Sequence, residues 1–390
     1  KITGSKSESN RVLLLQALYK GLKINNLSNS DDSQLMQAAL ASDSSTVDIH
    51  HAGTAMRFLT AYFATRSGIT TTLTGSSRMQ ERPIKILVEA LNSLGASITY
   101  TKNEGYPPLL IEGKSLTDNK VYLKANVSSQ YISALLLIAP TLSKGLSLHL
   151  EGIITSVPYI KMTLSLLEEL GVQTAFDGQI ISVLPFAEDI NKTFTVESDW
   201  SSASYFYSIV ALSPIGTQID LSAYKPNSLQ GDAVLKNIYK ELGVESSFNE
   251  TTLSLKKLAE PQSKQLTLDL ANAPDIAQTI AVTCLGLEIG CNLTGLHTLK
   301  IKETDRLVAL QNEIKKLGTS IEITDNSLHL KSPNKLNSSI HIATYNDHRM
   351  AMAFAPLGLK TQLFIDDADV VSKSYPDFWS DLSALGFELN

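Results

Sequence analysis

Seven cationic side chains stand at or near the starts of segments with a helical pattern, where unpaired backbone N–H groups and the helix dipole favour anions. They are Lys6, Arg11, Arg57, Arg78, Arg306, Arg349 and Lys373. A single arginine in such a place is usually a solvated surface cation or a partner in a helix-end ion pair. Because the arrangement recurs along one chain, it instead predicts a site for more than one phosphate or carboxylate.

Two carboxylates near these cations are candidates for proton transfer. Glu303, in the string KETDR, lies between Lys302 and Arg306, where a carboxylate can exchange a proton beside cationic ligands. Asp275, in the string NAPD, stands at a helix start and is equally well explained as a helix cap. Neither glycine-rich nucleotide motif, GxxxxGK[ST] or G-x-G-x-x-G, occurs in the sequence. We therefore expect a site without metal or cofactor.

The candidate residues belong to a unit that recurs along the chain. Each copy has two helix-like segments that end in glycine, and most copies add a hairpin pattern such as VQTAFDGQIISV or SIEITDNSLHL. The unit is about 70 residues long. The glycines are Gly21, Gly68, Gly145, Gly216, Gly290 and Gly358 after the first helices, and Gly95, Gly171, Gly243, Gly318 and Gly386 after the second. Three units on either side of about residue 198 predict two similar α/β domains, the first unit being shortened.

The composition is that of a globular protein of two domains, with 43% hydrophobic and 18% charged residues among 390. Its net charge of −6 argues against a nucleic-acid or anionic-membrane binder. Cys284 and Cys291 lie in an apolar stretch and are expected to be reduced core residues. We expect a soluble, cytoplasmic, monomeric protein that acts on small molecules, although the start at Lys1 leaves a leader upstream open.

Nine short strings carry a resemblance to a known enzyme family. In chain order they are GSKSESNR, AGTAMR, RMQERP, SSQ, PYI, QGD, KETDR, NDHRMAM and KSYPDF. Together they resemble the signature series of the 5-enolpyruvylshikimate-3-phosphate synthases, which are enolpyruvyl transferases. Each string alone is weak, but the series is specific and extends from Gly4 to Phe378.

The resemblance implies a two-domain inside-out α/β barrel in which each domain contains three βαβαββ repeats, with the active site in the cleft between the domains. A shikimate-3-phosphate-side domain would cover residues 6–198, and the second domain residues 1–5 plus 199–390. In this family, which serves aromatic amino acid biosynthesis, the 5-hydroxyl of shikimate 3-phosphate adds to the central carbon of phosphoenolpyruvate. The methylene carbon is protonated in that step, and phosphate then leaves.

The family's functional residues can be carried over one by one. Asp275 would take or orient the 5-hydroxyl proton, Glu303 would donate and accept the methylene proton, and Lys6 and Lys373 would complete the catalytic set, with His348 as a helper. Shikimate 3-phosphate would contact Lys6, Ser7, Arg11, Ser128, Ser129, Gln130, Ser156, Tyr159, Asp275 and Lys302. Phosphoenolpyruvate would contact Lys6, Gly53, Arg78, Gln130, Arg306, Arg349 and Lys373.

Three departures and two alternatives accompany the resemblance. His51 stands where the family usually has asparagine, Phe58 where proline is common, and Thr298 where asparagine is frequent. Glyphosate competes with phosphoenolpyruvate in this family, and Gly53, which lacks a Cβ, predicts that the inhibitor binds here too. One alternative, a UDP-N-acetylglucosamine enolpyruvyl transferase, typically has a cysteine that SSRMQERP lacks. The other, an inactive repeat protein, would not need both Asp275 and Glu303.

Overall fold

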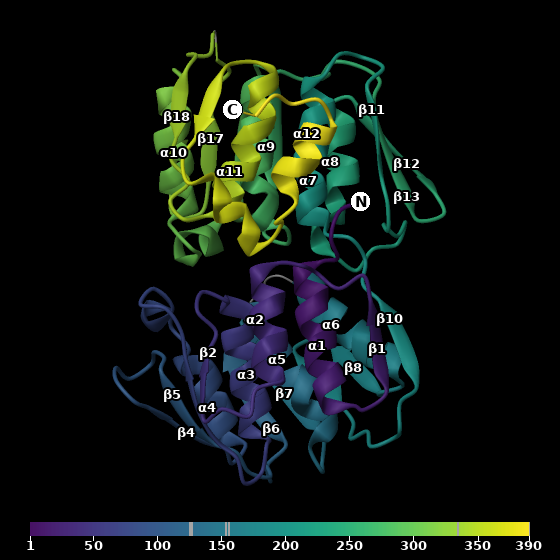
Figure 1. Ribbon diagram of the computed structural model, residues 1–390, viewed down its shortest axis with the longest axis vertical. Helices are drawn as coiled ribbons and strands as arrows, with labels where there is room; N and C mark the ends of the chain where they lie inside the picture. The colour runs from purple at the N-terminus through teal and green to yellow at the C-terminus, as the bar shows by residue number, and fades with distance from the viewer. Residues whose placement is uncertain (125–127, 153, 155–156, 334, 390) are drawn as a thin grey trace. The chain divides into compact units, whose positions relative to one another are not determined.

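The computed structural model describes residues 1–389 except 125–127, 153, 155, 156 and 334. The chain forms two compact units, an N-terminal unit of Gly4–Val196 and a C-terminal unit that joins Lys1–Thr3 to Glu197–Asn390. It therefore passes between the units after residues 3 and 196, compared with 5 and 198 in the sequence-based division. In each unit, helices are grouped inside and sheets flank them (Figure 1).

Three copies of the βαβαββ repeat are complete. In each copy the first two strands are parallel, and the hairpin joins the second strand through its last member, as in the order β2-β3-β5-β4. The first copy comprises β2 (Thr46–Asp48), α3 (Gly53–Ala64), β3 (Thr70–Thr74), α4 (Lys85–Ser93), β4 (Ser97–Tyr100) and β5 (Leu109–Glu112). The second comprises β6 (Lys120–Lys124), α5 (Ser129–Ile138), β7 (Leu146–Glu151), α6 (Val157–Leu170), β8 (Thr174–Asp177) and β9 (Ile180–Val183). The third comprises β14 (Gln265–Asp269), α9 (Ala277–Gly286), β15 (Gly290–Thr294), α10 (Arg306–Lys316), β16 (Ile321–Ile323) and β17 (Leu328–Leu330).

The other three copies have fewer strands in the described part of the chain. One copy, in the N-terminal unit, is assembled from both ends of that unit, because β1 pairs in parallel with β10. Its elements are α1 (Lys6–Leu18), β1 (Leu22–Asn25), α2 (Asp31–Leu40) and β10 (Lys192–Thr195). The C-terminal unit contains α7 (Trp200–Leu212), β11 (Gln218–Leu221), α8 (Leu235–Glu241), β12 (Val244–Asn249) and β13 (Thr252–Lys257), followed later by β18 (Ile340–Ile342), α11 (His348–Phe354), β19 (Leu363–Ile365) and α12 (Phe378–Ala384). The reduced first unit was anticipated by the short SDSSTVDI segment, whereas the reduced copies of the C-terminal unit were not.

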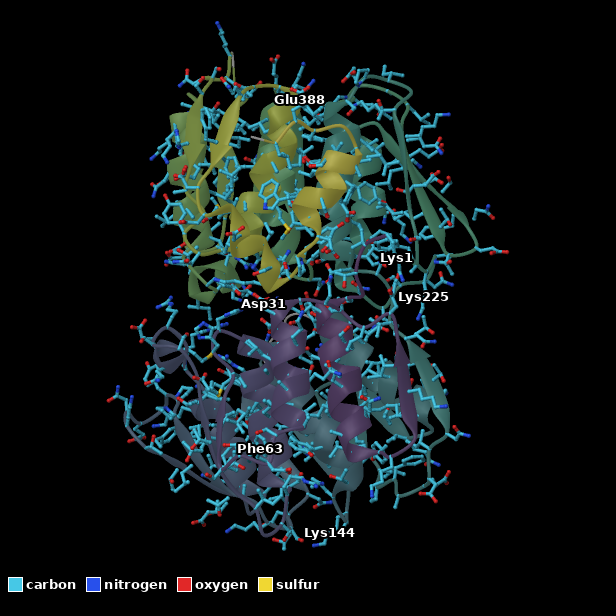
Figure 2. All side chains as sticks on the ribbon, viewed as in Figure 1. Lys1, Asp31, Phe63, Lys144, Lys225 and Glu388 are labelled. Carbon is cyan, nitrogen blue, oxygen red and sulfur yellow. The ribbon has the colours of Figure 1, made fainter. Side chains whose placement is uncertain are left out.

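The central helices are apolar on nearly every face. All twelve residues of α3 and all ten of α9 are buried, which is the pattern of a helix enclosed by other elements. Each unit has its own hydrophobic core, and Ile2 belongs to that of the C-terminal unit. In the N-terminal unit, Asp31 at the start of α2 and Lys144 lie at opposite ends (Figure 2). Burial of both central cysteines agrees with the sequence-based expectation.

The predicted turns are largely present. Nine of the eleven aligned glycines have positive φ, and at Gly243 an added Cβ would stand 1.8 Å from the Ala259 carbonyl oxygen. Gly290 differs because Glu288, two residues earlier, takes the left-handed conformation with φ of 58°. Among the described residues, no helix is long and apolar enough to cross a membrane.

Candidate active site

The cluster around Arg306 brings together the predicted proton-transfer residues of the C-terminal unit. Arg306 begins α10 and is only 2% exposed. Its Nη1 lies 2.8 Å from Asp275 Oδ1, and its Nη2 lies 2.7 Å from Glu303 Oε2. Its Nε lies 2.6 Å from Oδ2 of Asp347, a fully buried residue. One guanidinium therefore fixes three carboxylates.

The charge of this guanidinium is secured by its partners. Burial favours the neutral form, but Asp347, Glu303 and Asp275 outweigh it and raise the pKa of Arg306 above its ordinary value. Arg306 is thus a permanent cation in a region of low dielectric, where its field acts strongly on a bound anion.

Asp275 receives a second group of cations. It lies in the short helix η4 (Pro274–Ile276) before α9, and its Oδ1 is 3.4 Å from the Lys302 Nζ. Its Oδ2 is 3.5 Å from Nη2 of Arg349, whose Nη1 also donates to the Asp275 carbonyl oxygen at 3.0 Å. Burial raises the pKa of this carboxyl, but Lys302, Arg349 and Arg306 together hold it well below its ordinary range. Asp275 is therefore ionised at neutral pH.

Arg349 is also held by a polar group that the sequence analysis did not assign. Its Nη2 donates to Ser201 Oγ at 3.3 Å, and that hydroxyl donates to Oδ2 of Asp232. Asp232, in η3 (Gly231–Val234), is 3% exposed; burial, and then the Asp275 charge, raise its pKa to about 6. Asp232 belongs to the QGD string, but the sequence does not indicate that it shares the Ser201 hydroxyl with Arg349.

Lys373 lies at the end of η7 (Ala368–Lys373) and donates from Nζ to the Asn346 carbonyl oxygen at 2.7 Å. Asp347 accepts the Arg349 backbone N–H at 2.9 Å as the N-cap of α11. The predicted helper His348 is 3% exposed, with Nδ1 3.9 Å from Asp347 Oδ1. Asp347, which the sequence analysis did not assign, links two helix starts, because it pairs with Arg306 at the start of α10 and caps α11.

Arg11 forms the centre of a second cluster, in the N-terminal unit. It is 2% exposed and donates from Nε to Thr163 Oγ1 at 2.8 Å and from Nη2 to Ser133 Oγ at 2.8 Å. Its Nη1 donates to the Ser7 carbonyl oxygen at 2.7 Å, and the Tyr159 ring lies 5.9 Å from its Cζ. Burial lowers the pKa of Arg11 to about 10, and the Tyr159 and Glu8 charges oppose that shift. Arg11 therefore keeps its charge at neutral pH while its hydroxyl partners remain neutral.

Other predicted residues of the N-terminal unit lie at or near the starts of its helices. Lys6 Nζ is 4.0 Å from Oδ1 of Asp32, a buried carboxylate in the first turn of α2 that the sequence analysis missed. Ser128 caps α5 by accepting the Gln130 N–H, Ser129 is the first residue of that helix, and the Gln130 side chain donates to Thr54 Oγ1 at 3.1 Å. Ser156 lies outside the described residues.

The start of α3 distinguishes Arg82 from the predicted Arg78. Arg78 is exposed, and its Nη1 pairs with Glu81 Oε2 at 2.9 Å. Arg82 Nη1, in contrast, would stand 2.6 Å from a Cβ added to Gly53. Burial, and next the Arg82 charge, lower the pKa of Arg57 to about 10. Arg57 Nη1 also donates to the Gly53 carbonyl oxygen at 3.0 Å, so two cations, Arg57 and Arg82, lie beside the Gly53 backbone.

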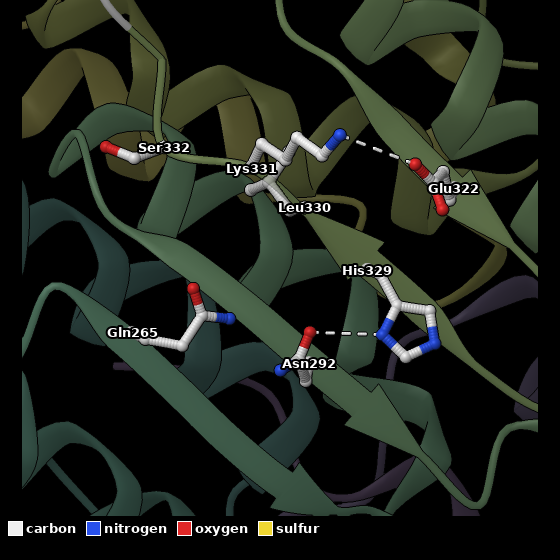
Figure 3. A pocket seen from close by; sticks show the side chains of 7 residues that line it. All are labelled: Gln265, Asn292, Glu322, His329, Leu330, Lys331 and Ser332. Carbon is white, nitrogen blue, oxygen red and sulfur yellow. Dashed lines mark hydrogen bonds and ion pairs between the residues drawn. The ribbon is translucent and has the colours of Figure 1, made fainter.

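A surface hollow elsewhere in the C-terminal unit contains none of the predicted residues (Figure 3). It lies over strands of the β14-β15-β17-β16 sheet. Its polar groups pair with one another: His329 Nδ1 is 3.0 Å from Asn292 Oδ1, and Lys331 Nζ is 3.5 Å from Glu322 Oε1. We assign no role in the reaction to this hollow. The described residues also contain no group of carboxylates, histidines and cysteines arranged for a metal ion.

Comparison with known proteins decides the family. A family model described as EPSP synthase (3-phosphoshikimate 1-carboxyvinyltransferase) matches residues 40–382. A 3-phosphoshikimate 1-carboxyvinyltransferase from Bacteroides fragilis is 48% identical over 392 residues, covering 99% of this chain and 95% of that protein. One from a Shewanella species is 35% identical over 414 residues, covering 98% and 96%. The chain belongs to the EPSP synthase family. It is an enzyme of the enolpyruvyl transfer reaction in the shikimate pathway, as the nine strings implied.

Solved structures support the fold. The EPSP synthase from Acinetobacter baumannii matches with a TM-score of 0.81 at 20% identity, over 100% of this chain and 96% of that one. The enolpyruvyl transferase NikO from Streptomyces tendae matches with a TM-score of 0.74 at 14% identity, over 99% and 94%. The two-domain α/β fold expected from the sequence, consistent with the inside-out barrel, is confirmed.

Proposed function

We propose that the Arg306 cluster binds phosphoenolpyruvate and carries the proton transfers, and that the Arg11 cluster binds shikimate 3-phosphate. The observation that supports this most strongly is the buried Arg306, which holds Asp275 and Glu303 at 2.8 and 2.7 Å. Both carboxylates are thereby fixed beside a cation that an anionic substrate requires. Arg349 and Lys373 add positive charge for the phosphate and carboxylate groups of phosphoenolpyruvate, and Lys302 remains a predicted contact of shikimate 3-phosphate.

Each step of the reaction can be assigned to a residue of the chain. The oxygen of the shikimate 3-phosphate 5-hydroxyl bonds to the central carbon of phosphoenolpyruvate, and the hydroxyl proton passes by way of Asp275 to water. The carbon–carbon double bond opens as the methylene carbon takes a proton from the protonated Glu303 carboxyl. The intermediate then loses phosphate as the carbon–oxygen bond breaks, and Glu303 takes a proton back from the methyl group. Orientation of two mutually repelling anions and neutralisation of their charge lower both barriers.

Asp275 is better suited to orienting the hydroxyl than to storing its proton. Three cations hold its pKa low, so its ionised oxygens accept a hydrogen bond readily but retain a proton poorly. Lys6, whose Nζ has the Asp32 carboxylate at 4.0 Å, is proposed to stabilise the developing charge on the same oxygen.

For phosphoenolpyruvate, Arg82 replaces Arg78 in our proposal. Its guanidinium lies against the Gly53 backbone at the start of α3, whereas Arg78 is exposed and paired with Glu81. Because Gly53 has no Cβ, this guanidinium can lie directly against the helix start. Gln130, at the start of α5, is proposed to contact both substrates.

For shikimate 3-phosphate, Arg11 and Tyr159 are proposed as the main contacts. The Arg11 guanidinium is held by two neutral hydroxyls and the Ser7 carbonyl, so an added phosphate meets a cation that is already positioned. Ser7, Ser128, Ser129 and the undescribed Ser156 remain predicted ligands, each able to donate a hydroxyl or backbone hydrogen bond.

A phosphate-release assay tests the proposed reaction. We expect release from phosphoenolpyruvate only when shikimate 3-phosphate is present, and none when UDP-N-acetylglucosamine is the acceptor. Release with the sugar nucleotide alone would refute the acceptor assignment. A monomeric state and a cytoplasmic location remain predictions, the first of which sedimentation at micromolar concentration would test.

A further inference from the structure

A tight turn precedes the Asp347 side chain that holds Arg306. Tyr345 and Asn346 are consecutive non-glycine residues with φ of 55° and 56°. The Asp347 N–H donates to the Thr344 carbonyl oxygen at 2.8 Å, which closes a turn of type I′. Residues with side chains rarely adopt this conformation, so contacts outside the turn must stabilise it.

Glu313 supplies those contacts. It lies in α10, two turns after Arg306, and its side chain is fully buried. Its Oε1 accepts from the Tyr345 hydroxyl at 2.7 Å, and its Oε2 accepts from the Ala343 N–H at 3.1 Å. Lys316 Nζ, 2.6 Å from the same Oε2, compensates the charge. One carboxylate therefore accepts hydrogen bonds from the residues before and after Thr344.

The Thr344–Asp347 turn holds two cations of the cluster, Arg306 and Lys373. Asp347 contacts Arg306 Nε at 2.6 Å, and the Asn346 carbonyl accepts from Lys373 Nζ at 2.7 Å. Helix α10 thus touches the turn twice, through the Arg306 side chain at its start and the Glu313 side chain farther along.

We propose that Glu313 is a positioning residue for phosphoenolpyruvate, acting through the Thr344–Asp347 turn on Arg306 and Lys373. It touches neither substrate in this assignment, and its effect passes through Asp347 and the Asn346 carbonyl. The proposal rests on the assignment of phosphoenolpyruvate to the Arg306 cluster.

Substitutions that keep the shape of the anchor test this role. Glu313→Gln removes the charge and one acceptor, and Tyr345→Phe removes only the hydroxyl. We expect Glu313→Gln to raise the phosphoenolpyruvate KM about tenfold and Tyr345→Phe about threefold, because charge-assisted hydrogen bonds are the stronger ones. The Kd of shikimate 3-phosphate, measured without phosphoenolpyruvate, should change less than about twofold in both. Tyr207→Phe is the matched control, since it removes a hydroxyl whose hydrogen-bond partner in the described part of the chain is Ser246 Oγ, at 2.7 Å.

A purely structural role would give a different result. If the anchor variants lost only thermal stability or active fraction, with the phosphoenolpyruvate KM equal to that of Tyr207→Phe, the proposal would be overturned. If Glu313→Gln does not fold, Tyr345→Phe decides between the two results alone. Lys373→Ala tests the substrate assignment separately from the positioning role. An unchanged phosphoenolpyruvate KM in this variant would refute the assignment of phosphoenolpyruvate to the Arg306 cluster. An effect in Lys373→Ala without one in the anchor variants would sink only the positioning role.

Discussion

Replacement of Gly53 by alanine tests how tightly Arg82 lies against the start of α3. The added Cβ would stand 2.6 Å from Arg82 Nη1 and 3.1 Å from both Cζ and Nη2, and ordinary contact begins at 3.4 Å. The guanidinium must therefore retreat by roughly 0.8 Å, the difference between 3.4 and 2.6 Å. A misplacement of about 1 Å can reduce catalysis as much as 100-fold, so we expect the phosphoenolpyruvate KM to rise about tenfold. The free energy of unfolding should fall by less than about 0.5 kcal/mol, because a flexible side-chain end yields easily.

Glyphosate provides a second measurement on the same variant. It is expected to compete with phosphoenolpyruvate here, and its inhibition constant should rise more than the phosphoenolpyruvate KM, because the longer ligand meets the added methyl first. Steady-state kinetics with shikimate 3-phosphate saturating would give both constants. Gly358→Ala is the control, since its added Cβ meets no atom within 4 Å. Unchanged constants in Gly53→Ala would refute the close approach of Arg82. If millimolar glyphosate does not inhibit the unmodified enzyme, the departures from the family at His51 and Phe58 become the explanation for its resistance.

Three further predictions concern single side chains. Arg82→Ala should raise the phosphoenolpyruvate KM about 100-fold and Arg78→Ala less than about threefold, as measured by kinetics; the reverse order would restore Arg78 as the ligand. Arg11→Ala should weaken shikimate 3-phosphate binding at least about 100-fold in titration calorimetry without phosphoenolpyruvate, and equal loss of both substrates would contradict the division of roles. Asp232 binds its proton more tightly when folded, with a pKa of about 6, so its contribution to stability falls as pH rises from about 4 to about 6. Relative to the parent, Asp232→Asn should thus gain up to about 3 kcal/mol in unfolding free energy between pH 4 and 7, and a constant difference would exclude the raised pKa.

Most of the fold was accessible from periodicity, because helices and hairpins are local patterns. The predicted hairpins at VQTAFDGQIISV and SIEITDNSLHL are β8 with β9 and β16 with β17. Pairing between distant segments was not accessible in this way. The parallel contact of β1 with β10 joins Leu22 to Lys192, and no local pattern marks either strand as the partner of the other.

The candidate site shows the same division. Asp275 and Glu303 were predicted as proton-transfer residues and Arg306 as a phosphoenolpyruvate ligand, and the structure places both carboxylates within 2.8 Å of the guanidinium. Asp347 was missed because an aspartate before a helix is adequately explained as a cap, and it does cap α11 while also pairing with Arg306. Arg82 was not singled out because it shares a string with Arg78, and the sequence alone does not show which of the two lies against Gly53.

Single-turnover phosphate release by Glu303→Gln is the most direct test of the proposed proton transfer. In the parent, Arg306 Nη2 lies 2.7 Å from Glu303 Oε2. The substitution keeps the size of the side chain and one oxygen that can accept this hydrogen bond, but it removes the group that exchanges protons. With both substrates saturating, we expect the rate to fall by about 100- to 10,000-fold while phosphoenolpyruvate binding changes less than about fivefold. A rate within about threefold of the parent would show that another group protonates the methylene carbon.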